Sequence, residues 1–162
     1  MMKKLTVTTC LTLACALPFA SKLQAKDEKV KLGDCPPAVQ KALEEKAAGG
    51  EIKKVEKASE ENGTVYEAEI KTKDGKEIEV TVTPEGKPVN TELKVKLAEC
   101  PAAVQKAIAE KSAGGTVKEV EKVVAASGKV TYTAEIKPAK GDTMELKVTE
   151  EGKVLKFEVD KD

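Results

Sequence analysis

The pattern of apolar and polar positions repeats along the chain with an offset of about 65 residues. The segments 35–50 and 100–115 have nearly the same sequence, in which a Cys-Pro step is followed by apolar residues at helical spacing and by two glycines. Proline suits the first turn of a helix, where its missing N–H has no partner to lose, and paired glycines favour a helix end. The pattern therefore predicts two short helices of about 12 residues each.

Four strand-like segments are predicted after each helix. The first of them, 51–58 and 116–125, have irregularly spaced apolar residues and many valines, which favours a strand with a bulge. The later segments alternate apolar and polar residues and are separated by Gly-containing turns. This alternation predicts one sheet face against the helix and the other face open to water.

The predicted fold class is therefore α+β, with two tandem units that each contain one short helix packed on a four-stranded antiparallel sheet. The units are expected at 26–93 and 94–162, because the last strand of the first unit runs directly into the second. A unit of this size buries only about 60% of its surface, so the two are expected to pack together or to share strands.

Residues 1–25 have the layout of a secretory signal peptide. A basic start precedes an apolar run that is too short to cross a bilayer, and Ala25 is the preferred cleavage position over Ala20. The alternative is lipoprotein processing at Cys15, where the residue three positions earlier is Thr12 instead of the usual apolar one. We therefore expect a periplasmic or secreted protein, and no later stretch is long and apolar enough for a membrane span.

The composition excludes several classes of partner and of catalytic site. Lysines and acids balance at 28 each, and the chain contains neither histidine nor arginine. Such a balance argues against nucleic acid and anionic membranes as partners, because both select a strongly basic surface. Without histidine the chain lacks a usual zinc ligand set and a base for a nucleophile. The sequence therefore predicts no catalytic residue, no metal site and no cofactor.

A row of acids is the main polar pattern on the predicted open face. Glu67, Glu69, Glu77 and Glu79 alternate with apolar residues on neighbouring strands and could form an acidic stripe. The favoured interpretation is cross-strand charge pairing on a solvated face.

Aromatic side chains are scarce after the predicted leader. The core must therefore be built from Val, Ile, Leu and Ala. Alternation places the three remaining aromatics in the core: Tyr66, Tyr132 and Phe157.

These motifs together resemble the PepSY-like domains, in particular the β-lactamase-inhibitor-like group. The resemblance rests on Pro-x-Ala-Val-Gln-Lys-Ala, Gly-Gly, Val-Glu-Lys, Tyr-x-Ala-Glu-Ile and a closing Glu-Gly-Lys turn, and it covers both repeats. It implies an exported, non-enzymatic protein-binding module, with an inhibitory or regulatory role toward an exported protease or β-lactamase. The alternative is a structural or envelope-associated protein without a tight specific partner. An uncovered apolar patch would favour the first function, and an unbroken Lys/Glu surface would favour the second.

Cys35 and Cys100 occupy equivalent positions just before the predicted helices, where members of the resembled family commonly have leucine. In an oxidising compartment they could form a disulfide, which requires their Cα atoms to lie within about 6 Å. The favoured alternative is that each thiol stays free and fills the small apolar position of that leucine.

Overall fold

The computed structural model describes residues 28–60 and 63–159. The helices and strands are β1 (Glu28–Val30), α1 (Pro37–Ala47), β2 (Glu51–Glu60), β3 (Gly63–Lys71), β4 (Glu77–Val82), β5 (Pro88–Lys94), α2 (Ala102–Ser112), β6 (Thr116–Ala125), β7 (Val130–Lys137), β8 (Met144–Thr149) and β9 (Val154–Val159). A short 3-10 helix precedes each α-helix, at Leu32–Asp34 and Leu97–Glu99. The predicted leader, with its cleavage position and Cys15, lies outside the described residues.

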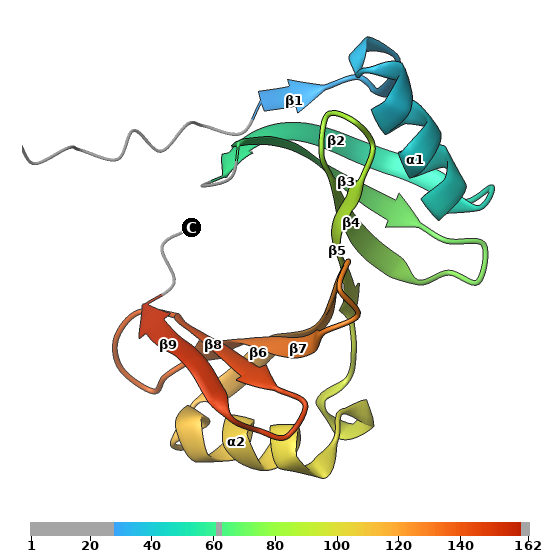
Figure 1. Ribbon diagram of the computed structural model, residues 1–162. Coiled ribbons are helices and arrows are strands. Elements are labelled where there is room, and N and C mark those ends of the chain that lie inside the picture. Colours follow the sequence, from blue (N-terminus) through green and yellow to red (C-terminus); the bar gives the residue numbers. More distant parts are fainter. Residues whose placement is uncertain (1–27, 61–62, 160–162) are drawn as a thin grey trace, which may run out of the picture.

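The strands form one antiparallel sheet of nine strands in chain order, from β1 to β9. Figure 1 shows that this sheet bends into an arc, with both helices on the outside and the other face lining the inside. The α+β class is as predicted, and four antiparallel strands follow each helix, β2 to β5 and β6 to β9. They form one continuous sheet together with β1 and not a separate four-stranded sheet in each unit, in keeping with the expectation that the units share strands. β5 pairs with β6 from Asn90–Ala125 to Lys94–Glu121, so the two halves share one sheet. The joint follows from the missing linker and from the small core that each half has alone.

Both irregular segments are bulged strands, as predicted. The register of β2 against β3 shifts between Ile52 and Lys54, and that of β6 against β7 shifts between Val117 and Glu119. The bulge explains why the apolar spacing in these strands departs from simple alternation. Successive side chains of a regular strand point to opposite faces, but the bulge lets Lys53 and Lys54 both reach glutamates of the same sheet, Glu77 on β4 and Glu69 on β3.

Each helix buries one apolar stripe against its own half of the sheet. Val39, Leu43 and Ala47 of α1 pack with residues of β2, β3 and β4, and α2 packs in the same way on β6, β7 and β8. The result is two separate cores on the outer side of the arc. The left-handed residue that ends each helix is an alanine and not a glycine: Ala48 (φ 48°) and Ala113 (φ 44°). The predicted glycine pairs, 49–50 and 114–115, follow directly after it.

A turn braces the start of each helix. Gly86 and Gly152 lie in the turns before β5 and β9 with φ of 73° and 80°. A Cβ at Gly86 would lie 2.4 Å from the carbonyl oxygen of Ala38, and one at Gly152 would lie 2.5 Å from that of Ala103. Only glycine allows this close approach of the turn to the helix.

The aromatic residues divide between core and surface. Tyr66 and Tyr132 are buried, as alternation predicts. The prediction for Phe157 is wrong, since its side chain is 39% exposed on the last strand of the sheet. Phe157 does point to the helix side, where Lys111 Nζ lies 5.4 Å from the centre of its ring. It stays exposed because, within the described ranges, β9 is the last strand of the sheet and nothing beyond it covers the ring.

The helices of the described residues are also informative about the membrane. None of them is long and apolar enough to cross a bilayer.

Candidate functional site

The candidate site is the inner face of the arc, which we call the open face. Alternation along each strand decides which residues it presents. On β4, Val80 is fully buried under α1, so its neighbour Glu79 points to the open face. The same alternation places Glu92 of β5 and Glu121 of β6 there, as diagonal neighbours across the joint between the two halves, since Glu92 lies opposite Val123 and Glu121 opposite Lys94.

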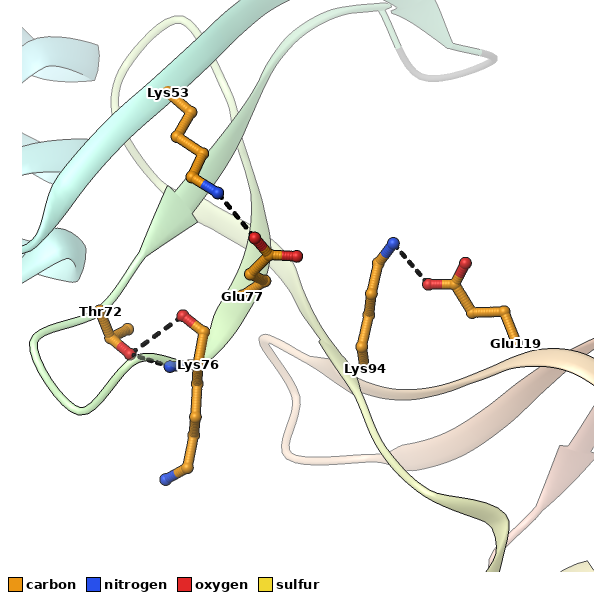
Figure 2. Close-up of polar contacts among 6 residues, drawn as sticks. All are labelled: Lys53, Thr72, Lys76, Glu77, Lys94 and Glu119. Carbon is orange, nitrogen blue, oxygen red and sulfur yellow. Dashed lines mark hydrogen bonds and ion pairs between the residues drawn. The ribbon is translucent and has the colours of Figure 1, made fainter.

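Ion pairs cover part of the open face. Lys53 Nζ lies 2.6 Å from Glu77 Oε1, and Lys94 Nζ lies 2.6 Å from Glu119 Oε1. Figure 2 shows that each pair joins two different strands, β2 to β4 and β5 to β6. Lys54 Nζ approaches Glu69 at 3.3 Å. Cross-strand pairing is therefore confirmed for Glu69, which lies opposite Lys54 on the neighbouring strand. Glu77 is also paired, but its partner Lys53 lies two strands away, across β3.

Three glutamates at the joint behave differently. Among the described residues, no lysine lies within the 4.0 Å ion-pair limit of the carboxylates of Glu79, Glu92 and Glu121. Burial and the neighbouring acids Glu121 and Glu79 raise the pKa of Glu92 to about 7, against a weaker opposing effect of Lys147. The side-chain amide of Asn90 donates a 3.3 Å hydrogen bond to Glu92.

The other two members of this group are perturbed for the same reasons. Burial raises the pKa of Glu79, and Glu121 and Glu69 raise it further. Burial and the nearby Glu119 raise the pKa of Glu121. Burial and like charge both disfavour ionisation, so the three carboxyls form an electrostatically frustrated cluster. We call Glu79, Glu92 and Glu121 the joint cluster.

Two shallow hollows meet at the joint cluster. Their volumes are about 170 Å³ and 370 Å³, and Glu92 and Glu121 line both. Besides Ile70, Ile78 and Thr133, their lining residues are eight glutamates and three lysines: Glu69, Glu77, Glu79, Glu92, Glu119, Glu121, Glu135, Glu145, Lys53, Lys94 and Lys147. Such a surface attracts positively charged groups. No group of three or more His, Cys, Asp or Glu within the described ranges is arranged to hold a metal ion.

The cysteines lie away from the open face. Cys35 and Cys100 are free, buried thiols in two separate cores, which favours the free-thiol alternative over the disulfide. Burial raises the pKa of both thiols, with Asp34 and Glu99 adding to the effect. Neither cysteine therefore has the lowered pKa of a nucleophile.

The repeated glutamine of the motif has a structural role that sequence reasoning missed. Gln40 Nε2 donates a 2.8 Å hydrogen bond to the carbonyl oxygen of Cys35, and Gln105 Nε2 donates an equal bond to that of Cys100. These bonds satisfy carbonyls that the proline after each cysteine keeps out of the helix. The matching spacing of cysteine and glutamine in the two repeats thus serves the helix start.

Sequence reasoning also missed Glu92 and Glu121. The stripe that it considered contains only Glu79 of the joint cluster. The other two residues lie on β5 and β6, and their proximity depends on the pairing of these strands across the two halves. The sequence predicts strands at 88–94 and 116–125, but the spacing of apolar residues along one strand does not say which strands are neighbours.

Comparison with known proteins supports the fold. Residues 38–85 match the PepSY family, described as peptidase propeptide and YPEB domain. No curated protein matches the chain in sequence. Several solved structures do match, including a candidate periplasmic protein from Bacteroides eggerthii, 24% identical with a TM-score of 0.64, which covers 76% of this chain and 88% of its own.

Two further solved structures show the same likeness. A DUF2874 family protein from Bacteroides uniformis is 21% identical with a TM-score of 0.64, over 76% of this chain and 88% of its own. A BLIP-like protein from Bacteroides fragilis is 21% identical with a TM-score of 0.60, over 77% of this chain and 87% of its own. At these identities the likeness establishes the fold, which most of this chain shares with them.

Proposed function

We propose that this chain is an exported, non-enzymatic protein-binding module that holds a basic segment of an exported partner on its open face. The chain would be directed out of the cytoplasm by residues 1–25, and 26–93 and 94–162 would be two copies of one PepSY-like unit. The joint cluster is the observation that carries the proposal. Its three carboxyls are partly buried around the same hollow, and a lysine or arginine of a partner would offset the cost of ionising them there.

The shape of the open face suits such a segment. The face is the inside of an arc, so a partner that enters it contacts both halves at once (Figure 1). The surrounding ion pairs, such as Lys53–Glu77 and Lys94–Glu119, are exposed and are worth only about 0–1 kcal/mol each, so they can rearrange at low cost. Charge complementarity of this kind contributes specificity and association rate.

The match to PepSY and the likeness to a BLIP-like protein support an inhibitory or regulatory role. The partner would then be an exported enzyme of protease or β-lactamase type. The alternative function is a structural or envelope-associated protein without a tight specific partner. It is favoured by one observation, that the open face carries charged residues where a hydrophobic interface would need an apolar patch.

A capture experiment separates the two functions. Three forms of the protein serve as bait in an envelope extract: the native sequence, the triple variant E79Q/E92Q/E121Q, and the control variant E44Q/E45Q/E110Q. The control removes the same number of charges from the exposed surfaces of the two helices. We expect a partner with a basic segment that binds the native and control baits and is lost with the joint-cluster variant.

The captured partner is then assayed with and without the native protein. An effect on a protease or β-lactamase activity would support the inhibitory role. The proposal fails if the joint-cluster variant retains the same proteins as the native bait, or if no protein is specifically retained by any bait. The second result would favour the structural alternative.

A further inference from the structure

The outer edge of β9 is the most apolar exposed part of the described chain. The described residues include five exposed large apolar side chains. Four of these belong to β9: Val154, Leu155, Phe157 and Val159. β9 pairs with β8 on one side and is the last strand of the sheet. A free edge of this kind presents backbone N–H and C=O groups that can pair with another strand.

The first half of the chain shows what covers the equivalent edge. Thr91 of β5 pairs with Val80 as Phe157 of β9 pairs with Leu146, so β5 and β9 occupy the same place in their halves. The outer edge of β5 is covered by β6 over five residue pairs. β9 is the more apolar of the two strands, with Phe157 at the position of Thr91. Yet among the described strands none pairs with the outer edge of β9.

The charges on β9 indicate which strand could pair with its outer edge. Lys156 and Glu158 flank Phe157 on the strand. If two β9 strands pair antiparallel about a two-fold axis at Phe157, Lys156 of each copy lies opposite Glu158 of the other. Moving the axis by one residue in either direction places two lysines or two glutamates opposite each other, which is destabilising. The strand is thus complementary to itself in one register.

We propose that the edge of β9 is a contact between two copies of this chain, paired antiparallel about a two-fold axis at Phe157. The axis would stand perpendicular to the sheet, so each face of one copy continues into the same face of the other. Phe157 and Val159 of both copies would then pack together on the α2 side, where Phe157 already opposes the buried Leu146. The Lys156–Glu158 pairs would lie on the side of the open face.

Existing contacts are compatible with this pairing. Lys156 Nζ lies 3.0 Å from Glu158 Oε1 of its own strand and 3.3 Å from Glu145 Oε2. These side chains are partly exposed, so a second strand can join them without breaking a buried pair. One strand per copy makes a small interface, and we therefore expect a reversible dimer that forms as the protein concentration rises.

Charge exchange tests the register. Sedimentation equilibrium is measured for the native protein, for K156E, for E158K and for K156E/E158K. Each single substitution places like charges opposite each other twice, and we expect the association constant to fall about tenfold or more. The double exchange restores opposite charges and should return it to within about threefold of the native value. A mixture of the K156E and E158K chains should also associate, as a heterodimer, because each supplies the charge that the other lacks.

Covalent trapping gives a second measurement. Phe157 faces its own copy across the axis, at a Cα separation of about 4.5–5.5 Å, which a disulfide can bridge. Mild oxidation should therefore cross-link F157C, while the matched control L155C, which faces Val159, should stay uncross-linked. Far-UV circular dichroism checks that each variant is folded. A native protein that stays monomeric up to about 500 µM would overturn the proposal. So would a mixture of K156E and E158K that does not associate, or equal cross-linking of F157C and L155C.

Discussion

Replacement of Glu92 by glutamine should stabilise the protein at any pH at which this carboxyl is ionised in the unfolded chain, and should have little effect at lower pH. The pKa of Glu92 is raised to about 7 in the fold, against about 4.3 in an unfolded chain. Between these values the folded state holds a proton that the unfolded state has lost. The free energy of unfolding therefore falls as the pH rises through this window, and the destabilisation is complete above pH 7 and absent below about pH 4.

The magnitude follows from the same values. A pKa difference of one is worth 1.36 kcal/mol, so the full difference would correspond to about 3–4 kcal/mol. Glu92 is only partly buried, and solvent screening reduces this value. We expect Glu92→Gln to raise the free energy of unfolding by about 1–2 kcal/mol at pH 8, and to change it little at pH 4.

Urea unfolding at pH 8, pH 6 and pH 4 measures this difference. Glu69→Gln is the matched control on the same face, because Glu69 is exposed and paired with Lys54. Its loss should cost at most about 1 kcal/mol at pH 8, which is the opposite direction. The reasoning is refuted if Glu92→Gln is no more stable than the native protein at pH 8, or if its advantage grows toward low pH.

Two further predictions concern the outer side of the sheet. In protein that lacks residues 1–25, and with them Cys10 and Cys15, alkylation should modify Cys35 and Cys100 slowly in the folded state and give two adducts by mass after denaturation, because both are free thiols whose pKa burial raises; an unreduced chain with no adduct would contradict this. Gly152→Ala should lower the free energy of unfolding by about 2–4 kcal/mol in a urea melt, because φ is 80° and the new Cβ would lie 2.5 Å from the Ala103 carbonyl oxygen. Gly33→Ala has open space around it and should change stability by less than about 0.5 kcal/mol, so equal losses would show that the close approach is unimportant.

Local patterns in the sequence predict the elements of this fold well. The Pro-rich helix starts, the bulged strands β2 and β6, and the buried Tyr66 and Tyr132 all depend on residues close together in the chain. Their physical causes are the fixed φ of proline, the valine content of the strands and the alternation of apolar side chains. Each of these acts within a few residues, so a single sequence contains the whole signal.

The sequence indicates that the two halves pack together or share strands, but it does not predict which strands pair. It predicts that β5 and β6 are strands, and nothing in it shows that they are neighbours. The single sheet and the proximity of Glu92 to Glu121 both follow from that pairing. Phe157 was misplaced for a related reason. Its alternation is that of a core residue, and only its position on the last strand leaves it exposed.

The central claim is that the joint cluster binds positive charge presented by a partner, and a defined peptide tests it most directly. The affinity of a fluorescent octalysine peptide is measured by anisotropy at low salt for the native protein, E79Q/E92Q/E121Q and E44Q/E45Q/E110Q. We predict that the native and control proteins bind alike at pH 8, and that the joint-cluster variant binds at least about fivefold more weakly. Native binding should also weaken between pH 8 and pH 6, as Glu92, with its pKa of about 7, takes up a proton. Equal affinity of all three proteins at pH 8, with no change at pH 6, would contradict the account.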